Sequence, residues 1–512
     1  MVVKTYGSAV YGVDAATITV ETNVGGGIKY FIVGLPDNAV KESLFRIESS
    51  IKHIDFRMPR DKIVVNLSPA DIRKEGSAYD LPIAIGILAS SGQINTDKLA
   101  DFVMMGELSL DGLLQPLRGA LPMTIQAMKE GFKGIILPKA NILEAAIVKG
   151  INVYGVENIR EVIDLVNGQS TLEPTFVNAR EEFFAHNEHA DFDFSEVKGQ
   201  ENIKRALEIA AAGGHNVILI GPPGAGKTML ARRLPTILPP LSLQEALETT
   251  KIYSVAGKLP SNAGLMATRP FRSPHHTISD VALVGGGGNP MPGEISLAHN
   301  GVLFLDELPE FKRSVLEVMR QPMEERKVTI SRARVSIDYD CSFLLVASLN
   351  PCLCGFYNHP TKQCSCPPGA VTKYLSRISG PIMDRIDLHV EVTPVELSEL
   401  SGVRKSESSV QIRERVIKGR EVQSLRFNAH KDLYCNAQMS SKMTREICAL
   451  APVSQTLLNT AMTRLGLSAR AYDRILKVSR TIADLAGSNE IKMEHLAEAI
   501  QFRSLDRDAW GA

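Results

Sequence analysis

The segment GPPGAGKT, residues 221–228, constrains the fold of this chain more than any other stretch of its sequence. An apolar run, NVILI, precedes it at residues 216–220, and a run typical of a helix, TMLARRL, overlaps its end. A strand, a glycine-rich loop and a helix in this order predict an α/β fold that binds phosphate, because successive backbone N–H groups and the helix N-terminus face the anion. Lys227 is expected to reach the outer phosphates, and the Thr228 hydroxyl is placed to ligate Mg²⁺. The whole predicted loop is Gly221, Pro222, Pro223, Gly224, Ala225, Gly226, Lys227 and Thr228.

A second apolar run ends in an acidic pair. VLFLDEL, residues 302–308, predicts a buried strand followed by Asp306 and Glu307. We expect Asp306 to hold the Mg²⁺ shell and Glu307 to polarise the attacking water. A glycine-rich loop alone is more often an ordinary turn. With its flanking elements and this acidic pair, however, it predicts hydrolysis of a nucleoside triphosphate, and ATP is favoured over GTP.

Two further polar residues are predicted to complete this site. FLLVASLN, residues 343–350, indicates a third buried strand, and Asn350 at its end is placed to orient the catalytic water. The simpler alternative for Asn350 is a turn before a proline. Arg385, in the run GPIMDRIDLHV, is expected to act on the nucleotide of a neighbouring subunit. Its simpler alternative is a local salt bridge with Asp384 or Asp387.

The last predicted member of the site lies near the C-terminus. The run GLSARAYDRIL places Arg470 at a helix start and Arg474 one turn later. Either side chain could reach the γ-phosphate and report its presence to a helical lid, and we assign this role to Arg470. An ordinary surface charge is the competing interpretation.

Periodicity divides the 512 residues into four parts. Residues 1–165 alternate short β-like and helical runs, which predicts an α+β or α/β domain. The polar, acidic residues 166–195 are interpreted as a linker, although the run AREEFFAH within them fits a packed helix equally well. Strand–helix alternation over residues 196–394 is typical of a nucleotide-binding domain, and residues 395–512 are predicted to be almost entirely helical.

The amino-acid composition indicates where the protein is located but not what it binds. Lys+Arg and Asp+Glu both number 57, so the net charge neither favours nor excludes nucleic acid, and any DNA surface must be local. The longest apolar runs are far shorter than a membrane span, and the first residues lack the pattern of a signal peptide. We therefore expect a cytoplasmic protein without membrane contact, in which most of the seven cysteines are reduced.

Four of these cysteines lie close together in a glycine- and proline-rich run, NPCLCGFYNHPTKQCSCPPG. Cys352, Cys354, Cys364 and Cys366 form two C-x-C pairs that can complete a tetrahedral Zn²⁺ site. All four positions would be closed by protein, so the metal would be structural. His359 lies within the run as a competing ligand, and reduced structural thiols or redox pairing are the alternatives to zinc.

The order of these motifs resembles an AAA+ ATPase of the helix-2-insert, Mg-chelatase-like branch. Residues 198–241, 271–287 and 293–311 closely resemble the ComM/YifB family, and the likeness runs from near Met1 to the C-terminal FRSLDR. This resemblance implies an α/β fold with three domains: a Lon-protease-like (ribosomal S5 domain 2-like) α+β domain, an AAA+ P-loop domain with a helix-2 insert, and a C-terminal helical lid.

The resemblance also implies a function. Members are expected to form a hexameric ring that uses ATP and Mg²⁺ and, in naturally transformable bacteria, to act as a DNA branch-migration helicase. The implied partners are single-stranded and branched DNA and the recombination machinery. A Mg-chelatase motor that drives metal insertion into a porphyrin, and a protein-remodelling ATPase, are the alternatives. DNA-stimulated ATP turnover is expected only for the translocase.

The N-terminal part resembles the proteolytic domain of Lon, through residues 66–86 and 106–141. That domain uses a serine–lysine dyad. In an ungapped overlay the serine position falls on Ala78 and the lysine position on Leu121, and the neighbouring Ser77 has no lysine at the matching place. We therefore expect a degenerate domain that serves as a scaffold for ring assembly or DNA contact.

A ring motor holds nucleic acid through cationic loops that face its pore. One candidate is a predicted β-hairpin at residues 327–340, and another is the glycine- and proline-rich insertion at residues 271–294. Alternating charges on a solvated strand and histidines that cap a turn are the competing interpretations. The candidate DNA contacts are Arg332, Arg334, Arg272, His275 and His276.

Overall fold

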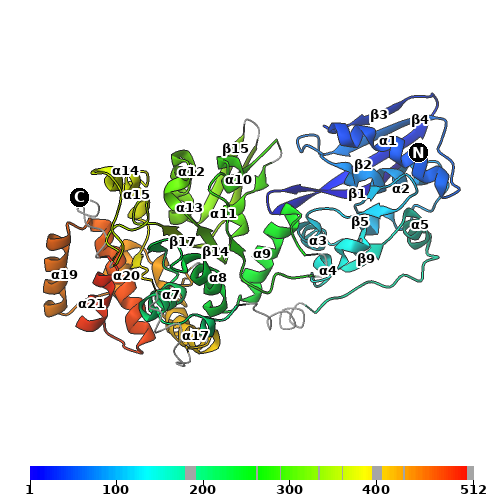
Figure 1. The fold of residues 1–512 in the computed structure, drawn as a ribbon. Helices are drawn as coiled ribbons and strands as arrows, with labels where there is room; N and C mark the ends of the chain where they lie inside the picture. The colour runs from blue at the N-terminus through cyan, green and yellow to red at the C-terminus, as the bar shows by residue number, and fades with distance from the viewer. Residues whose placement is uncertain are drawn as a thin grey trace.

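The computed structural model describes residues 1–178, 192–260, 263–288, 290–332, 335–359, 361–394, 406–430 and 433–503. Figure 1 shows three parts in a row: an N-terminal α/β part in blue to cyan, a central α/β part in green to yellow, and C-terminal helices in orange to red. The helix α9 (Leu243–Ala256) lies where the central part meets the N-terminal part.

The N-terminal part is built on a seven-stranded mixed sheet of order β3-β4-β2-β1-β5-β8-β9. Strands β1, β2 and β4 pair antiparallel, and β5, β8 and β9 continue from β1 in parallel. Side-chain alternation sets the register, since Ile63, Val65 and Leu67 of β4 are buried while the residues between them are not. The strands are β1 (Val2–Tyr11), β2 (Asp14–Gly25), β3 (Tyr30–Val33), β4 (Lys62–Ser68), β5 (Phe102–Met104), β6 (Glu107–Leu108), β7 (Leu114–Gln115), β8 (Gly134–Pro138) and β9 (Asn152–Val156), and the helices are α1 (Asn38–His53), α2 (Asp80–Ser90), α3 (Ala120–Lys129), α4 (Ile142–Ala145) and α5 (Ile159–Asn167).

The central part is built on a five-stranded sheet of order β11-β14-β17-β10-β18, in which every pairing is parallel. Both faces are covered, because Val217 and Leu219 of β10 join one apolar cluster and Ile218 and Ile220 join another. The carboxyl ends of the strands share one edge of this sheet. The strands are β10 (Val217–Ile220), β11 (Phe271–Arg272), β14 (Val302–Leu305), β17 (Leu344–Leu349) and β18 (Leu388–Glu391), and the helices around them are α7 (Glu201–Gly213), α8 (Lys227–Ile237), α12 (Arg313–Val318), α13 (Arg320–Glu325), α14 (Ala370–Leu375) and α15 (Gly380–Met383).

Two insertions extend from this central sheet. The first lies between β11 and β14 and contains α10 (Asp280–Val284), β12 (Gly285–Gly286), β13 (Met291–Pro292) and α11 (Glu294–Leu297). The second is a hairpin of β15 (Lys327–Arg332) and β16 (Val335–Asp340), in which Ser331 pairs with Ser336. The hairpin expected at residues 327–340 is therefore confirmed.

The described residues from 406 onward form helices that pack on the central part. They are α17 (Ser409–Arg426), α18 (Ser441–Ile447), α19 (Pro452–Leu465), α20 (Ala469–Leu485) and α21 (Met493–Gln501). Buried Asp484 pairs with Arg426 at 2.5 Å and with Arg480 at 3.1 Å, which compensates its loss of hydration and joins α17 to α20.

The tip of the β1–β2 hairpin connects the N-terminal part to the β15–β16 hairpin. The Tyr11 hydroxyl donates to the Ser336 carbonyl at 3.1 Å, and Val13 packs against the apolar cluster that contains Ile337. Gly12 has φ +63°, and a Cβ there would lie 2.7 Å from Ile337 Cγ2. The turn therefore approaches the second hairpin as closely as a glycine permits.

The expectation of a mixed α/β fold with a parallel sheet is confirmed. The boundaries near residues 165, 195 and 394 stay predictions, and the AREEFFAH run of the expected linker lies outside the described residues. Among the described helices, none combines the length and the apolar character needed to cross a membrane.

Candidate functional site

The predicted phosphate loop connects β10 to α8. Strand β10 ends at Ile220 and α8 begins at Lys227, so the loop leads directly into a helix N-terminus. Gly224 and Gly226 have φ of +79° and +84°, a region that favours glycine. The curvature expected of an anion-binding loop is therefore present.

Lys227 is the buried cation of this loop. Its Nζ donates to the carbonyls of Gly221 at 2.6 Å and Pro222 at 3.0 Å, and to Asn350 Oδ1 at 3.1 Å. Burial lowers the pKa of Lys227, and the carboxylates of Asp306 and Glu307 act in the opposite direction. Asn350 follows β17, which pairs with β10, so neighbouring parallel strands bring the lysine and the amide together.

The acidic pair follows β14 at the same edge of the sheet. The Thr228 hydroxyl donates to Asp306 Oδ2 at 2.8 Å, so the two predicted Mg²⁺ ligands already lie side by side. Ser348 donates to the other oxygen of Asp306 and was not predicted. The sequence distinguishes Ser348 only as a small polar residue inside the apolar run LLVASL. Glu307 has φ +54°, which turns the chain sharply after Asp306.

His276 lies beside Glu307. The sequence places both His275 and His276 among the candidate DNA contacts, and that role stays untested. His276 Nδ1 is 3.6 Å from Glu307 Oε2, whereas His275 Nδ1 lies 2.9 Å from the Thr277 hydroxyl. The two rings are 4.1 Å apart, so the first insertion reaches the predicted catalytic base.

The cationic candidates for DNA contact differ in their surroundings. Arg272 forms a bidentate pair with Glu294, with Nε and Nη2 contacts at 2.6 and 2.7 Å. Its guanidinium is therefore partly neutralised within the insertion. Arg332 ends strand β15, but its side chain and the whole of Arg334 lie outside the described residues.

Arg385 is held within its own chain. Its Nη2 lies 2.7 Å from Glu324 Oε1 of α13, and its Nη1 donates to the Pro381 carbonyl at 2.7 Å. The ion pair is thus formed with Glu324 rather than with Asp384 or Asp387, the partners considered from the sequence.

Of the two arginines considered for the γ-phosphate, Arg474 faces the central part and Arg470 is exposed. Arg474 pairs with buried Asp387, whose Oδ2 also lies 3.6 Å from His215 Nδ1. Desolvation favours the protonated acid, but Arg474 and His215 outweigh it and hold the pKa of Asp387 well below its usual range. Arg474 therefore fastens α20 to the segment before β18, and Arg470 lies one turn earlier.

The four predicted zinc ligands come together. Their sulfur atoms all lie within 4.8 Å of one another, and the Cys352, Cys354 and Cys364 sulfurs are 3.3–3.7 Å apart. These separations exceed the ~2.05 Å of a disulfide. They lie near the ~3.8 Å edge of a tetrahedron with Zn–S distances of about 2.3 Å. The cluster, including Cys366, is compatible with zinc.

His359 stabilises a turn of this loop. Its Nδ1 accepts from the backbone N–H groups of Thr361 at 3.2 Å and Lys362 at 3.1 Å. The histidine thus fixes a turn, and it is not a member of the metal-ligand cluster found among the described residues.

The positions of the Lon-like dyad hold no catalytic pair. Ala78 is partly buried and Leu121 is fully buried in the N-terminal part. Neighbouring Ser77 donates its hydroxyl hydrogen to the Glu107 carboxylate. This arrangement supplies no lysine base to the serine.

The chain is similar to several known proteins. Three family models match it: magnesium chelatase subunit ChlI at residues 193–400, subunit ChlI of Mg-chelatase at residues 20–141, and the ChlI C-terminal model at residues 406–503. Competence protein ComM of Haemophilus influenzae is 43% identical over 505 residues, which cover 98% of this chain and 97% of the relative. Uncharacterized protein YifB of Escherichia coli is 44% identical over 502 residues, which cover 98% and 96%. Lon protease 2 of Bacillus subtilis is 33% identical over 157 residues, 28% of this chain and 27% of the relative, so that likeness is partial.

Proposed function

Because the chain belongs to the ComM/YifB family of Mg-chelatase-like AAA+ proteins, we propose that it is an ATP-driven ring motor that moves DNA junctions during recombination in natural transformation. The observation that carries the motor part is the meeting of Lys227, Thr228, Asp306 and Asn350 at one edge of the parallel sheet. The competence name of a relative that matches the full chain supports the DNA part, and for the same reason the chelatase and protein-remodelling alternatives are less favoured.

The residues of the site divide the work of phosphoryl transfer. Lys227 exchanges its contacts with the loop carbonyls for contacts with phosphate oxygens, and Asn350 orients the water that attacks. Thr228 and Asp306 hold Mg²⁺, which neutralises charge on the phosphates when it is bound. Glu307 accepts the proton of the attacking water, and its exposed position leaves room for that water.

The remaining assignments complete the proposal. Arg385 acts on the nucleotide of the next subunit in a hexameric ring, and Arg470 reports the γ-phosphate to the helical lid. The cysteine cluster holds one structural Zn²⁺. The DNA contacts are Arg332, Arg334, Arg272, His275 and His276.

ATP turnover with and without DNA tests this function. Lys227→Ala should abolish tight ATP binding, whereas Glu307→Gln should keep binding and lose about 100-fold or more in turnover, as expected when a general base is removed. Single-stranded and branched DNA should both raise the turnover of the unaltered protein. A protein that hydrolyses ATP but neither binds DNA nor responds to it at low salt would instead support a chelatase-like or protein-remodelling motor.

Metal analysis tests the cluster. Freshly prepared, reduced protein should carry about one Zn²⁺ per chain, because four thiolates close one tetrahedral site. The double change Cys352→Ser and Cys364→Ser should remove it, and Cys448→Ser, a buried cysteine outside the cluster, should not. Protein without zinc in both the unaltered chain and the variants would disprove the metal assignment.

A further inference from the structure

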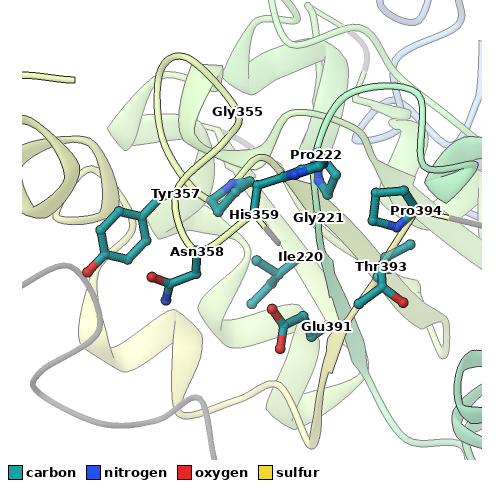
Figure 2. A pocket seen from close by; sticks show the side chains of 12 residues that line it. Ile220, Gly221, Pro222, Gly355, Tyr357, Asn358, His359, Glu391, Thr393 and Pro394 are labelled. Carbon is teal, nitrogen blue, oxygen red and sulfur yellow. The ribbon is translucent and has the colours of Figure 1, made fainter. Parts of the chain in front are cut away.

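The cysteine loop, described at residues 351–359 and 361–366, lies beside the start of the phosphate loop. Figure 2 shows a pocket lined by Gly221 and Pro222 of the phosphate loop and by Gly355 and His359 of the cysteine loop. The end of β18 closes the remaining side. Two segments that are more than a hundred residues apart in sequence thus share one small space.

Two contacts join the cysteine loop to the phosphate loop. At its base, Asn350 Oδ1 accepts from Lys227 Nζ at 3.1 Å, and only Pro351 separates Asn350 from the first cysteine. At its tip, Gly355 packs on Pro223. A Cβ on Gly355 would lie 2.5 Å from Pro223 Cδ, so the glycine backbone lies closer to the proline ring than a residue with a side chain could.

Both contacts lie next to thiolates of the cluster. Cys352 is fully buried, and its carbonyl accepts from the Gly355 backbone N–H at 3.0 Å. Cys354 directly precedes Gly355. A metal that fixes these two sulfurs against Cys364 and Cys366 therefore also fixes the peptide that touches Pro223.

We propose that the metal-bound cysteine loop is a positioning element of the nucleotide site, so that loss of the metal weakens ATP binding through the Gly355–Pro223 and Asn350–Lys227 contacts. This inference rests on the proposed nucleotide site and zinc cluster. Misplacement of reacting groups by about 1 Å can cost up to ~100-fold in rate, and the contacts of the cysteine loop act on the segment that positions the phosphates. Metal occupancy of the cluster then sets the affinity for ATP of a site that other residues form, in addition to stabilising the cysteine loop itself.

A pair of glycines allows a direct test in the full chain. Gly355→Ala adds a methyl group against Pro223 at a residue with φ +81°, whereas Gly369→Ala adds one at φ +78° with no neighbour within 4 Å. Both variants carry the same backbone strain, and only the first presses on the phosphate loop. Equilibrium titration with a fluorescent ATP analogue should show affinity about tenfold weaker for Gly355→Ala and within about twofold of the unaltered protein for Gly369→Ala. Zinc content and melting temperature should match between the two variants.

Removal of the metal provides a second test of the proposal. Protein stripped with a chelator, or carrying Cys352→Ser with Cys364→Ser, should lose affinity to a similar extent, and returning Zn²⁺ should restore it only in the stripped protein. Equal affinity of Gly355→Ala and Gly369→Ala, or unchanged affinity after metal removal from a protein that stays folded, would overturn the inference and leave the nucleotide site standing. Failure of the unaltered, zinc-loaded protein to bind the nucleotide would instead overturn the proposed function.

Discussion

At the scale of single residues, the two carboxylates of the acidic pair have different surroundings. Asp306 accepts hydrogen bonds from Thr228 and Ser348, and its position is fixed. Glu307 is exposed, and its carboxylate lies 3.6 Å from His276. A general base must point at its water, so a neighbour that orients the carboxylate affects turnover without touching the phosphates.

Replacement of His276 tests this orienting contact. His276→Ala should lower the turnover number by about tenfold, a part of the ~10²–10⁴ that a general base supplies, with nucleotide affinity unchanged. His275→Ala is the matched control, because this neighbouring histidine directs its Nδ1 to the Thr277 hydroxyl and not to Glu307. Steady-state kinetics and nucleotide titration of both variants measure the effect. Equal turnover in the two variants would show that the histidine does not orient the base.

The residues of the candidate site that follow strand ends are predictable from the sequence. Asp306 and Asn350 were predictable because apolar runs mark the buried strands and parallel strands share their carboxyl edge. His276 and Glu324 were not found as partners of Glu307 and Arg385, because such pairs depend on how an insertion and a distant helix fold back. Local pattern carries no information on such contacts.

At the scale of elements, the hairpin predicted to hold DNA is contacted by the N-terminal part. Tyr11 and Ser336 are 325 residues apart in sequence, and their hydrogen bond joins the β1–β2 turn to β16. The alternation of residues 327–340 predicted the hairpin, but a docking contact of this separation follows only from the packed structure. A scaffold that touches the hairpin proposed to hold DNA can set the position of that hairpin, which is the role expected of the degenerate N-terminal domain.

A methyl group in the turn tests whether this docking matters. Gly12→Ala collides with Ile337, whereas Gly92→Ala carries similar strain, at φ +73° against +63°, with no neighbour within 4 Å. Gly12→Ala should lower the stimulation of ATP turnover by DNA severalfold and leave turnover without DNA unchanged. Measurement of both rates for the two variants decides the matter, and identical stimulation would show that the docked turn is only a structural contact.

At the scale of the whole molecule, the proposal requires subunits that complete each other's sites. Arg385 is 8% exposed and is paired with Glu324, so action on a neighbouring nucleotide requires this ion pair to open when a ring assembles. Glu324 is half exposed, and a phosphate of the neighbouring nucleotide would replace its carboxylate as the partner of the buried guanidinium, so the charge stays compensated when the pair opens.

Mixed rings test action between subunits. Arg385→Ala and Lys227→Ala proteins should each be inactive, and mixing them should restore part of the turnover, because some interfaces then combine an intact loop with an intact arginine. Glu324→Gln should keep activity, since it removes only the resting partner of the arginine. Absence of rescue in rings verified to be mixed would assign Arg385 to its own chain.

Movement of a DNA junction is the measurement that tests the central claim most directly. With ATP and Mg²⁺, the protein should convert a labelled branched DNA into its separated arms, and Glu307→Gln protein should bind the same substrate without converting it. Binding should weaken steeply with salt, because cationic contacts to phosphates release counterions. ATP hydrolysis by the unaltered protein without any junction movement or DNA binding at low salt would contradict the account.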